Sequence, residues 1–189
     1  MEPSKLLRGR RVRLSAMTEA DLESVARWYE DPDFLRFYDS LPAYPKTAES
    51  LKEWLKERQE ASDEFWFAVR LVSSGGLIGM VAIDGIEWSN RSGWLSIGIG
   101  DQSNWNQGFG REATELLVEF GFNELNLHRI TLTVFRYNER AIALYEKIGF
   151  QHEGTFRDFG ERDGKRYDML LYGLLRPEWA ERKTLRPRE

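Results

Sequence analysis

A glycine-containing turn between a strand pattern and a helix pattern constrains this chain more than any other feature. Residues 105–113 read Trp-Asn-Gln-Gly-Phe-Gly-Arg-Glu-Ala, with glycine at positions 108 and 110. Alternating apolar residues precede this segment, and apolar residues at helical spacing follow it. Glycine has no Cβ, so the backbone can approach a ligand closely there. The helix that begins at this turn presents N–H groups without partners and the positive end of its dipole. The sequence therefore predicts a phosphate-binding site between a strand and a helix.

Different kinds of phosphate-binding loop compete for this segment. The phosphate-binding loop of nucleotide hydrolases requires Lys-Ser or Lys-Thr after its second glycine. Here Arg-Glu follows Gly110, so this kind of loop is excluded. The relaxed dinucleotide fingerprint fits Gly108, Gly110 and Ala113. However, the motif lies past the middle of the chain. Too few residues follow it to complete one half of a doubly wound dinucleotide-binding fold. Arg136, after the next strand, would suit a 2′-phosphate, so NADP stays open as an alternative to coenzyme A.

The loop resembles the acyl-coenzyme A pyrophosphate loop of the GNAT superfamily of N-acetyltransferases, usually written Arg/Gln-x-x-Gly-x-Gly/Ala. Residues 138–150 read Asn-Glu-Arg-Ala-Ile-Ala-Leu-Tyr-Glu-Lys-Ile-Gly-Phe and look like the next motif of that superfamily. The two motifs occur in the right order, separated by one predicted helix and one predicted strand, which is more specific than either motif alone. Residues 9–22 and 168–175 resemble the branch that contains ribosomal-protein N-terminal acetyltransferases. The resemblance covers residues 9–178.

This resemblance implies transfer of an acetyl group from acetyl-CoA, the acetyl donor, to a primary amine by direct attack in a ternary complex. A peptide N-terminus, a polyamine, an aminoglycoside and an amino sugar are all compatible acceptors, and the branch favours a protein N-terminus. The aromatic segment 28–44 and the hairpin at 161–167 are the elements expected to shape the acceptor pocket. A different class of function stays open as the alternative. It is a non-catalytic acyl-CoA-binding sensor or partner-binding module.

The hydrophobic pattern predicts an α/β fold, of the α+β sandwich type, in one domain over residues 1–178. We expect a mixed, mostly antiparallel central sheet of about seven strands, flanked by about four helices. The resemblance implies that strands four and five run parallel and splay apart around the cofactor. Residues 31–32 are predicted to end the first helix, and residues 34–45 are predicted to form a loop. The charged tail, residues 179–189, is expected to fray.

The resemblance also implies which residues bind the cofactor. They are Ile97, Gly98, Ile99, Trp105, Asn106, Gln107, Gly108, Phe109, Gly110, Arg111 and Asn138. Asn138 is also a good N-cap for the helix that follows it. The small residues Ser96 and Gly98 share one face of their strand, and either a ligand or a bulky neighbour would occupy the space they leave. Trp105 stands where Arg or Gln is frequent in the superfamily, and Asn106 stands where this branch usually has glycine.

Acetyl transfer to an amine needs a proton donor for the leaving thiolate and a base for the amine. Tyr145 matches the tyrosine that often serves as the acid in the superfamily, although its place on an apolar helix face also suits an ordinary core residue. Many relatives place a basic glutamate in strand four, where this chain has Trp94. We therefore take Glu87 as the candidate base, with Asp84 and an ordered-water relay as alternatives. A backbone N–H within residues 97–99 is the candidate for polarising the thioester carbonyl.

Composition excludes several other classes. The formal net charge of −4 argues against non-specific nucleic-acid binding and is compatible with a cationic substrate. The chain has no cysteine, and its histidines, His128 and His152, have no neighbouring acidic cluster, so we assign no metal site. It contains no long apolar run and no signal-peptide pattern, so we expect a cytoplasmic protein that does not bind membranes. A homodimer through a sheet edge or the aromatic loop stays open.

Overall fold

The computed structural model describes residues 6–185 and contains one seven-stranded mixed sheet. The strand order is β1-β2-β3-β4-β5-β7-β6, and only the β4–β5 pair is parallel. The strands are β1 (Val12–Ser15), β2 (Phe65–Leu71), β3 (Leu77–Glu87), β4 (Ser92–Ile99), β5 (Arg129–Phe135), β6 (Gln151–Arg162) and β7 (Lys165–Leu175). This confirms the predicted fold class and its mostly antiparallel sheet.

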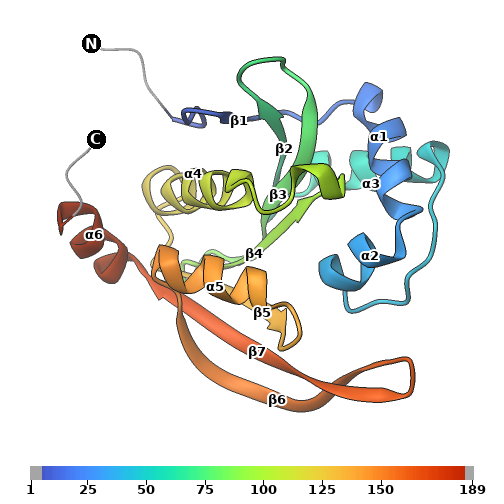
Figure 1. Ribbon diagram of the computed structural model, residues 1–189. Coiled ribbons are helices and arrows are strands. Elements are labelled where there is room, and N and C mark those ends of the chain that lie inside the picture. The colour runs from blue at the N-terminus through green and yellow to red at the C-terminus, as the bar shows by residue number, and fades with distance from the viewer. Residues whose placement is uncertain (1–5, 186–189) are drawn as a thin grey trace.

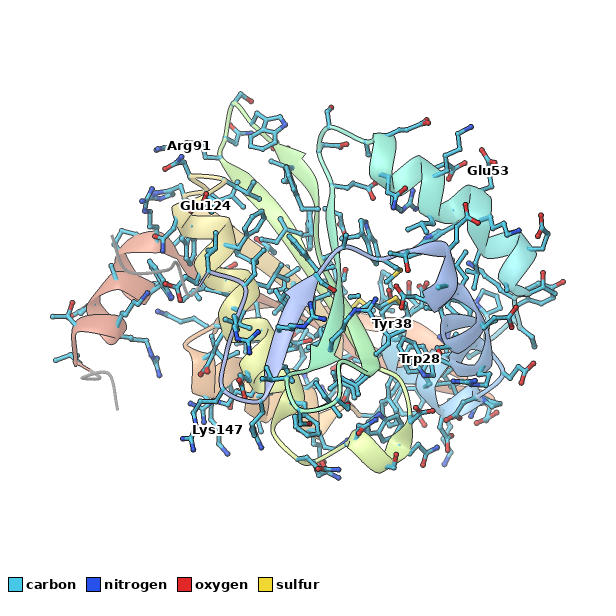
Figure 2. All side chains as sticks on the ribbon, turned by 90° about the horizontal axis from the view of Figure 1, so that it is seen from above. Trp28, Tyr38, Glu53, Arg91, Glu124 and Lys147 are labelled. Carbon is cyan, nitrogen blue, oxygen red and sulfur yellow. The ribbon has the colours of Figure 1, made fainter. Side chains whose placement is uncertain are left out.

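Helices cover both faces of the sheet (Figure 1). They are α1 (Leu22–Tyr29), α2 (Pro32–Tyr38), α3 (Ala48–Glu60), α4 (Phe109–Asn123), α5 (Glu139–Ile148) and α6 (Arg176–Leu185), with short 3₁₀ turns at Glu19–Asp21 and Gln102–Asn104. One buried cluster joins α4 and α5 to the sheet, and a second joins α1, α2 and α3 to the opposite face. Seen from above, the sheet lies between these two groups of helices (Figure 2). None of the helices within residues 6–185 is long and apolar enough to cross a bilayer.

The β4–β5 pair is short, and this shortness creates the central feature of the fold. The register pairs only residues 92–94 of β4 with residues 129–131 of β5. Beyond Trp94, β4 continues along β3 as far as Ile99, and β5 continues along β7 as far as Phe135. Within the described residues the two parallel strands therefore splay apart after Trp94, as the resemblance implied.

The two faces of β4 have different neighbours. Leu95 is buried, and Ile97 packs partly buried against the same cluster, which contains α4 and α5. Gly98 lies on the other face, where a Cβ would be 2.8 Å from the Tyr38 ring. Tyr38 stacks on Phe34 with 5.2 Å between ring centroids. A bulky aromatic neighbour therefore fills the space next to Gly98, which is one of the two possibilities that the sequence left open.

Helix α2 corrects the predicted loop at residues 34–45. Pro32 does not continue α1, which ends at Tyr29, but it occupies the first turn of a new helix. The side chain of Asp31 caps that helix by accepting a hydrogen bond of 2.9 Å from the Asp33 backbone N–H. Proline is tolerated at this position because the first N–H groups of a helix have no partner within it. The prediction was therefore wrong for residues 34–38, and the described chain has more than the expected number of helices.

Helix α6 runs across the predicted domain boundary at residue 178. Trp179 packs against Phe122 of α4, with 5.2 Å between ring centroids. The carboxylate of Glu178 accepts hydrogen bonds from the Leu175 backbone N–H at 2.9 Å and from the Gln151 amide at 2.7 Å. These contacts hold residues 179–185 in a helix where fraying was expected. The last residues of the predicted tail, 186–189, lie outside the described residues.

Candidate active site

A cavity of about 690 Å³ occupies the space where β4 and β5 splay apart. Its walls come from α2, β3, β4, the loop before α4, the first turn of α4, the end of β5 and one face of α5. The residues predicted to bind the cofactor line it with one exception. Those that do are Ile97, Gly98, Ile99, Trp105, Asn106, Gly108, Phe109, Gly110, Arg111 and Asn138. The sheet and the glycine turn thus converge on one site.

The glycine turn has the geometry that an anion site requires. Gly108 is the N-cap of α4 with φ of 80°, and Asn106 also has a positive φ, of 59°. Glycine adopts this conformation without cost, and asparagine tolerates it better than most residues. The N–H groups of the first turn of α4 have no partner within the helix, because the Glu112 N–H is the first to bond back to Gly108. The turn therefore directs backbone donors and the positive end of the helix dipole at the cavity.

Gln107 is the predicted cofactor residue that does not line the cavity. Its carbonyl accepts a hydrogen bond of 2.7 Å from the Arg11 guanidinium. Its side-chain amide donates to the Ser103 carbonyl. The loop bends so that Asn106 and Gly108 face the cavity while Gln107 faces the surface near β1. Gln107 therefore supports the loop from outside.

Trp105 and Asn138 hold the backbone of the site in addition to lining it. The indole Nε1 of Trp105 donates a hydrogen bond of 2.7 Å to the Ile99 carbonyl, which fixes the loop against the end of β4. The side chain of Asn138 accepts a hydrogen bond of 3.3 Å from the Ala141 backbone N–H, which confirms Asn138 as the N-cap of α5. The tryptophan that departs from the superfamily pattern thus serves as an anchor between loop and strand.

Tyr145 lies on α5 with its side chain buried and its ring edge-on to Phe150, 5.9 Å between centroids. It also lines the cavity, and its hydroxyl makes no hydrogen bond with any residue in the described part of the chain. Burial raises the pKa of Tyr145 well above its usual value. The hydroxyl therefore stays protonated at neutral pH and is free to donate a proton into the cavity. Both sequence-based interpretations of Tyr145, core residue and proton donor, are compatible with this position.

The structure does not bring Glu87 to the cavity. Its carboxylate accepts a hydrogen bond of 2.7 Å from the Asn90 side chain in the exposed turn between β3 and β4. The β3–β4 register shifts between Asp84 and Glu87. A position for Glu87 inferred from residue spacing along the strand is therefore wrong. Asp84, the second choice, does line the cavity. Its carboxylate accepts a hydrogen bond of 3.2 Å from the Ser96 hydroxyl of β4.

The charges that line the cavity are divided between its elements. The basic side chains, Arg111, Arg140 and Lys147, come from α4 and α5. The acidic ones, Asp39 and Asp84, come from the end of α2 and from β3. An anionic ligand group is therefore favoured beside α4 and α5, and a cationic one beside α2 and β3.

Arg140 is a lining residue that the sequence analysis did not single out. Its guanidinium lies 4.3 Å from the centroid of the Trp105 ring and 5.1 Å from that of the Phe37 ring. These cation–π contacts tie α5, the cofactor loop and α2 together. The available signal was a basic residue in the first turn of α5, next to Glu139 and close to Asn138.

Comparison with known proteins places this site in a family. A protein-family model described as "Acetyltransferase (GNAT) domain" matches residues 11–151 of this chain. The chain belongs to the GNAT acetyltransferases. It is 30% identical over 149 residues to an uncharacterized N-acetyltransferase of SPbeta prophage origin, YokL, from Bacillus subtilis strain 168, covering 79% of this chain and 82% of the relative. It is 28% identical over 155 residues to spermidine N(1)-acetyltransferase of Vibrio cholerae, covering 82% of each.

A solved structure of the spermidine N-acetyltransferase from Vibrio cholerae, in complex with CoA and spermine, superimposes with a TM-score of 0.82 at 25% identity. The match covers 89% of this chain and 98% of that one. This GNAT protein is therefore an N-acetyltransferase that uses acetyl-CoA as donor and an amine as acceptor. This assignment replaces two alternatives from the sequence analysis. They are the dinucleotide interpretation of the glycine turn and the non-catalytic acyl-CoA-binding module.

Proposed function

We propose that this GNAT enzyme acetylates a primary amine carried on a slim cationic molecule of the polyamine class. The division of charge in the cavity carries this proposal, because Asp39 and Asp84 lie at the end formed by α2 and β3. An ammonium group is stabilised by carboxylates and by the faces of aromatic rings, and Tyr38 and Trp94 line the same region. The relatives named for spermidine support the same acceptor class.

The residues of the cavity fit acetyl-CoA, which supplies the acetyl group as a reactive thioester. The first turn of α4, from Phe109, and the backbone at Gly108 would hold the phosphates, since both offer N–H donors to the cavity. Arg111 would add positive charge there; in the structure it pairs with Glu115 at 2.9 Å on the exposed side of α4. The side of β4 that faces away from β3 would hold the remainder along residues 97–99.

Two groups of the chain would act on the reacting atoms. A backbone N–H within residues 97–99 would polarise the thioester carbonyl, because a fixed donor needs no reorganisation during the reaction. The Tyr145 hydroxyl would protonate the leaving thiolate, since it lines the cavity, makes no hydrogen bond with another described residue and carries a proton throughout the physiological range. Both groups line the cavity.

An acceptor panel tests the proposed function. Release of the CoA thiol is measured with acetyl-CoA and, in turn, spermidine, a peptide with a free N-terminus, a free amino acid and an aminoglycoside. We expect kcat/KM for spermidine to exceed that for the peptide at least about tenfold, since the carboxylates that line the cavity favour a slim polycation. A preference for the peptide would contradict the polyamine class, and release that does not depend on any amine would contradict acetyl transfer.

The cytoplasmic location expected from the sequence stays a prediction, and the homodimer stays an open possibility. Light scattering of the purified protein at several concentrations would measure its mass in solution. Exposed apolar side chains on β6, Phe156 and Phe159, mark the surface where a substitution should weaken any self-association.

A further inference from the structure

We propose that Asp84 binds the ammonium group of the acceptor and acts as the general base that removes its proton. This inference rests on the proposed function and names the residue that would make the amine reactive. Asp84 lies on β3, whereas the groups proposed to act on the thioester, the backbone at residues 97–99 and Tyr145, lie on β4 and α5. No other cavity-lining residue in the described chain offers a carboxylate except Asp39.

Asp39 is already engaged in local structure. It lies at the C-cap of α2, and its carboxylate accepts a hydrogen bond of 3.0 Å from the Leu41 backbone N–H. Its carbonyl accepts one of 3.1 Å from the Arg162 guanidinium. The Asp39 carboxylate is therefore fixed by the backbone of the turn after α2, whereas among the described residues the Asp84 carboxylate accepts only from the Ser96 side chain.

Asp84 is partly buried without a cationic partner. Among the described residues it forms no ion pair, and its hydrogen bond comes from the neutral hydroxyl of Ser96. Removing a carboxylate from water without pairing it costs free energy, so such a group is expected where a ligand supplies the positive charge. A primary ammonium group has the charge and the N–H donors to do so.

Aromatic residues form the surroundings of this carboxylate. Trp94 is the cross-strand partner of Asp84 in the β3–β4 register, so the two side chains lie on the same face of the sheet. Tyr38 of α2 lines the cavity on this side and packs over Gly98. Rings around a carboxylate favour an organic cation with a slim alkyl chain over a hydrated metal ion.

Charged and titratable groups from the neighbouring elements act on Asp84 in both directions. Burial raises the pKa of Asp84, and the hydrogen bond from Ser96 opposes this. The carboxylates of Glu64 and Asp63, both in the segment just before β2, raise the pKa further, whereas Arg58 of α3 lowers it. Arg58 is itself paired with Glu64 at 3.0 Å. The net effect is a raised pKa, so Asp84 is a stronger base than an exposed aspartate.

Asp84 begins the proposed reaction by removing a proton from the acceptor. The bound ammonium gives one proton to Asp84 and becomes a neutral amine, whose nitrogen forms a bond with the thioester carbonyl carbon. The carbon–sulfur bond breaks, and the sulfur takes a proton from Tyr145. The nitrogen, which still carries one proton too many, returns a proton to Tyr145 through water, and Asp84 releases its proton to solvent. The products are the amide, the CoA thiol and one proton.

The test compares Asp84→Asn with wild type, using spermidine as the acceptor. We expect kcat/KM for spermidine to fall about 100-fold or more, the range for loss of a general base. The acid limb of the kcat/KM–pH profile should disappear in this variant, because the amide at position 84 does not titrate. The affinity for acetyl-CoA, measured by calorimetry, should stay within about twofold, which also shows that the variant is folded. Asp84→Glu should recover part of the activity.

Two further variants separate the alternatives. Glu53→Gln removes an exposed charge of α3 outside the cavity and should leave kcat/KM within about twofold of wild type. A larger loss in Glu87→Gln than in Asp84→Asn would overturn the inference, and so would an unchanged acid limb in Asp84→Asn. If wild type acetylates no amine in the panel, the proposed function fails and this inference fails with it. If wild type is active and Asp84→Asn matches it, only the inference fails.

Discussion

Arg11 and Glu112 join the edge of the sheet to the first turn of α4. The backbone N–H of Arg11 donates to Glu112 Oε1 at 2.8 Å, and the Arg11 Nε donates to Glu112 Oε2 at 3.2 Å. The same guanidinium donates to the Gln107 carbonyl and lies 5.1 Å from the centroid of the Phe109 ring. Arg11, beside β1, therefore contacts both the cofactor loop and the first turn of α4, including the Glu112 carboxylate. These contacts position the loop before any ligand binds.

Glu112→Ala should weaken acetyl-CoA binding because it releases the loop from β1. We expect the dissociation constant to rise about tenfold, equivalent to about 1.4 kcal/mol, with little change in KM for the amine. Isothermal calorimetry with acetyl-CoA measures the effect. Glu119→Ala in the same helix, which pairs with Lys183 near the surface, is the matched control and should bind normally. Equal affinities in both variants would contradict a positioning role for Glu112.

Tyr145→Phe should lower turnover without weakening the fold. The phenyl ring keeps the packing against Phe150, whereas the proton donor for the thiolate is lost. We expect kcat to fall about 100-fold and KM for acetyl-CoA to change little. Tyr172→Phe is the control, since its hydroxyl donates to Glu146 at 2.9 Å and does not line the cavity. A Tyr145→Phe enzyme with wild-type kcat across the pH range would remove Tyr145 from the mechanism.

Gly98→Ala should destabilise the protein by about 1–3 kcal/mol, because the new methyl group meets the Tyr38 and Phe34 rings at about 3 Å. Urea unfolding followed by fluorescence measures the change. Gly154→Ala on β6 is the control, where the nearest atom, from Leu171, would be 3.9 Å from the new Cβ. If both variants unfold at the same urea concentration, the aromatic stack does not depend on Gly98.

The buried pair of Asp21 and Arg70 should make stability depend on pH. Burial alone would raise the pKa of Asp21, but hydrogen bonds from Arg70 and Thr18 outweigh it and hold the pKa below its usual value. A lowered pKa in the folded state means that the stabilisation is complete above the unfolded-state pKa and is lost as the pH falls through the folded-state pKa.

Asp21→Asn should therefore be less stable than wild type by about 3 kcal/mol at neutral pH. This difference should shrink as the pH falls below the unfolded-state pKa and through the lowered folded-state pKa, where the wild-type carboxylate also becomes protonated. Urea unfolding at several pH values measures it. Glu53→Gln, on the exposed side of α3 (Figure 2), is the control and should show no such trend. A difference that stays constant with pH would mean that charge is not its origin.

Local patterns predict the strands, the glycine turn and the cap at Asn138, because each depends on a few neighbouring residues. Pro32 shows the limit of that reasoning, since the same residue that ends one helix also begins the next. The choice between Asp84 and Glu87 depends on a shift in strand register, which spacing along the chain does not reveal. The contact of Tyr38 with Gly98 joins residues far apart in the sequence, so only the folded chain can show it.

The short pairing of β4 with β5 leaves two strand edges facing each other inside the molecule. Most proteins pair or cover such edges permanently, because exposed backbone groups invite unwanted association. In acetyl-CoA the arm that ends in the thioester carries amide groups, and in the proposed binding mode these amides would pair with the free strand edges. The donor substrate would then act as a removable strand, and each catalytic cycle would complete the sheet and open it again.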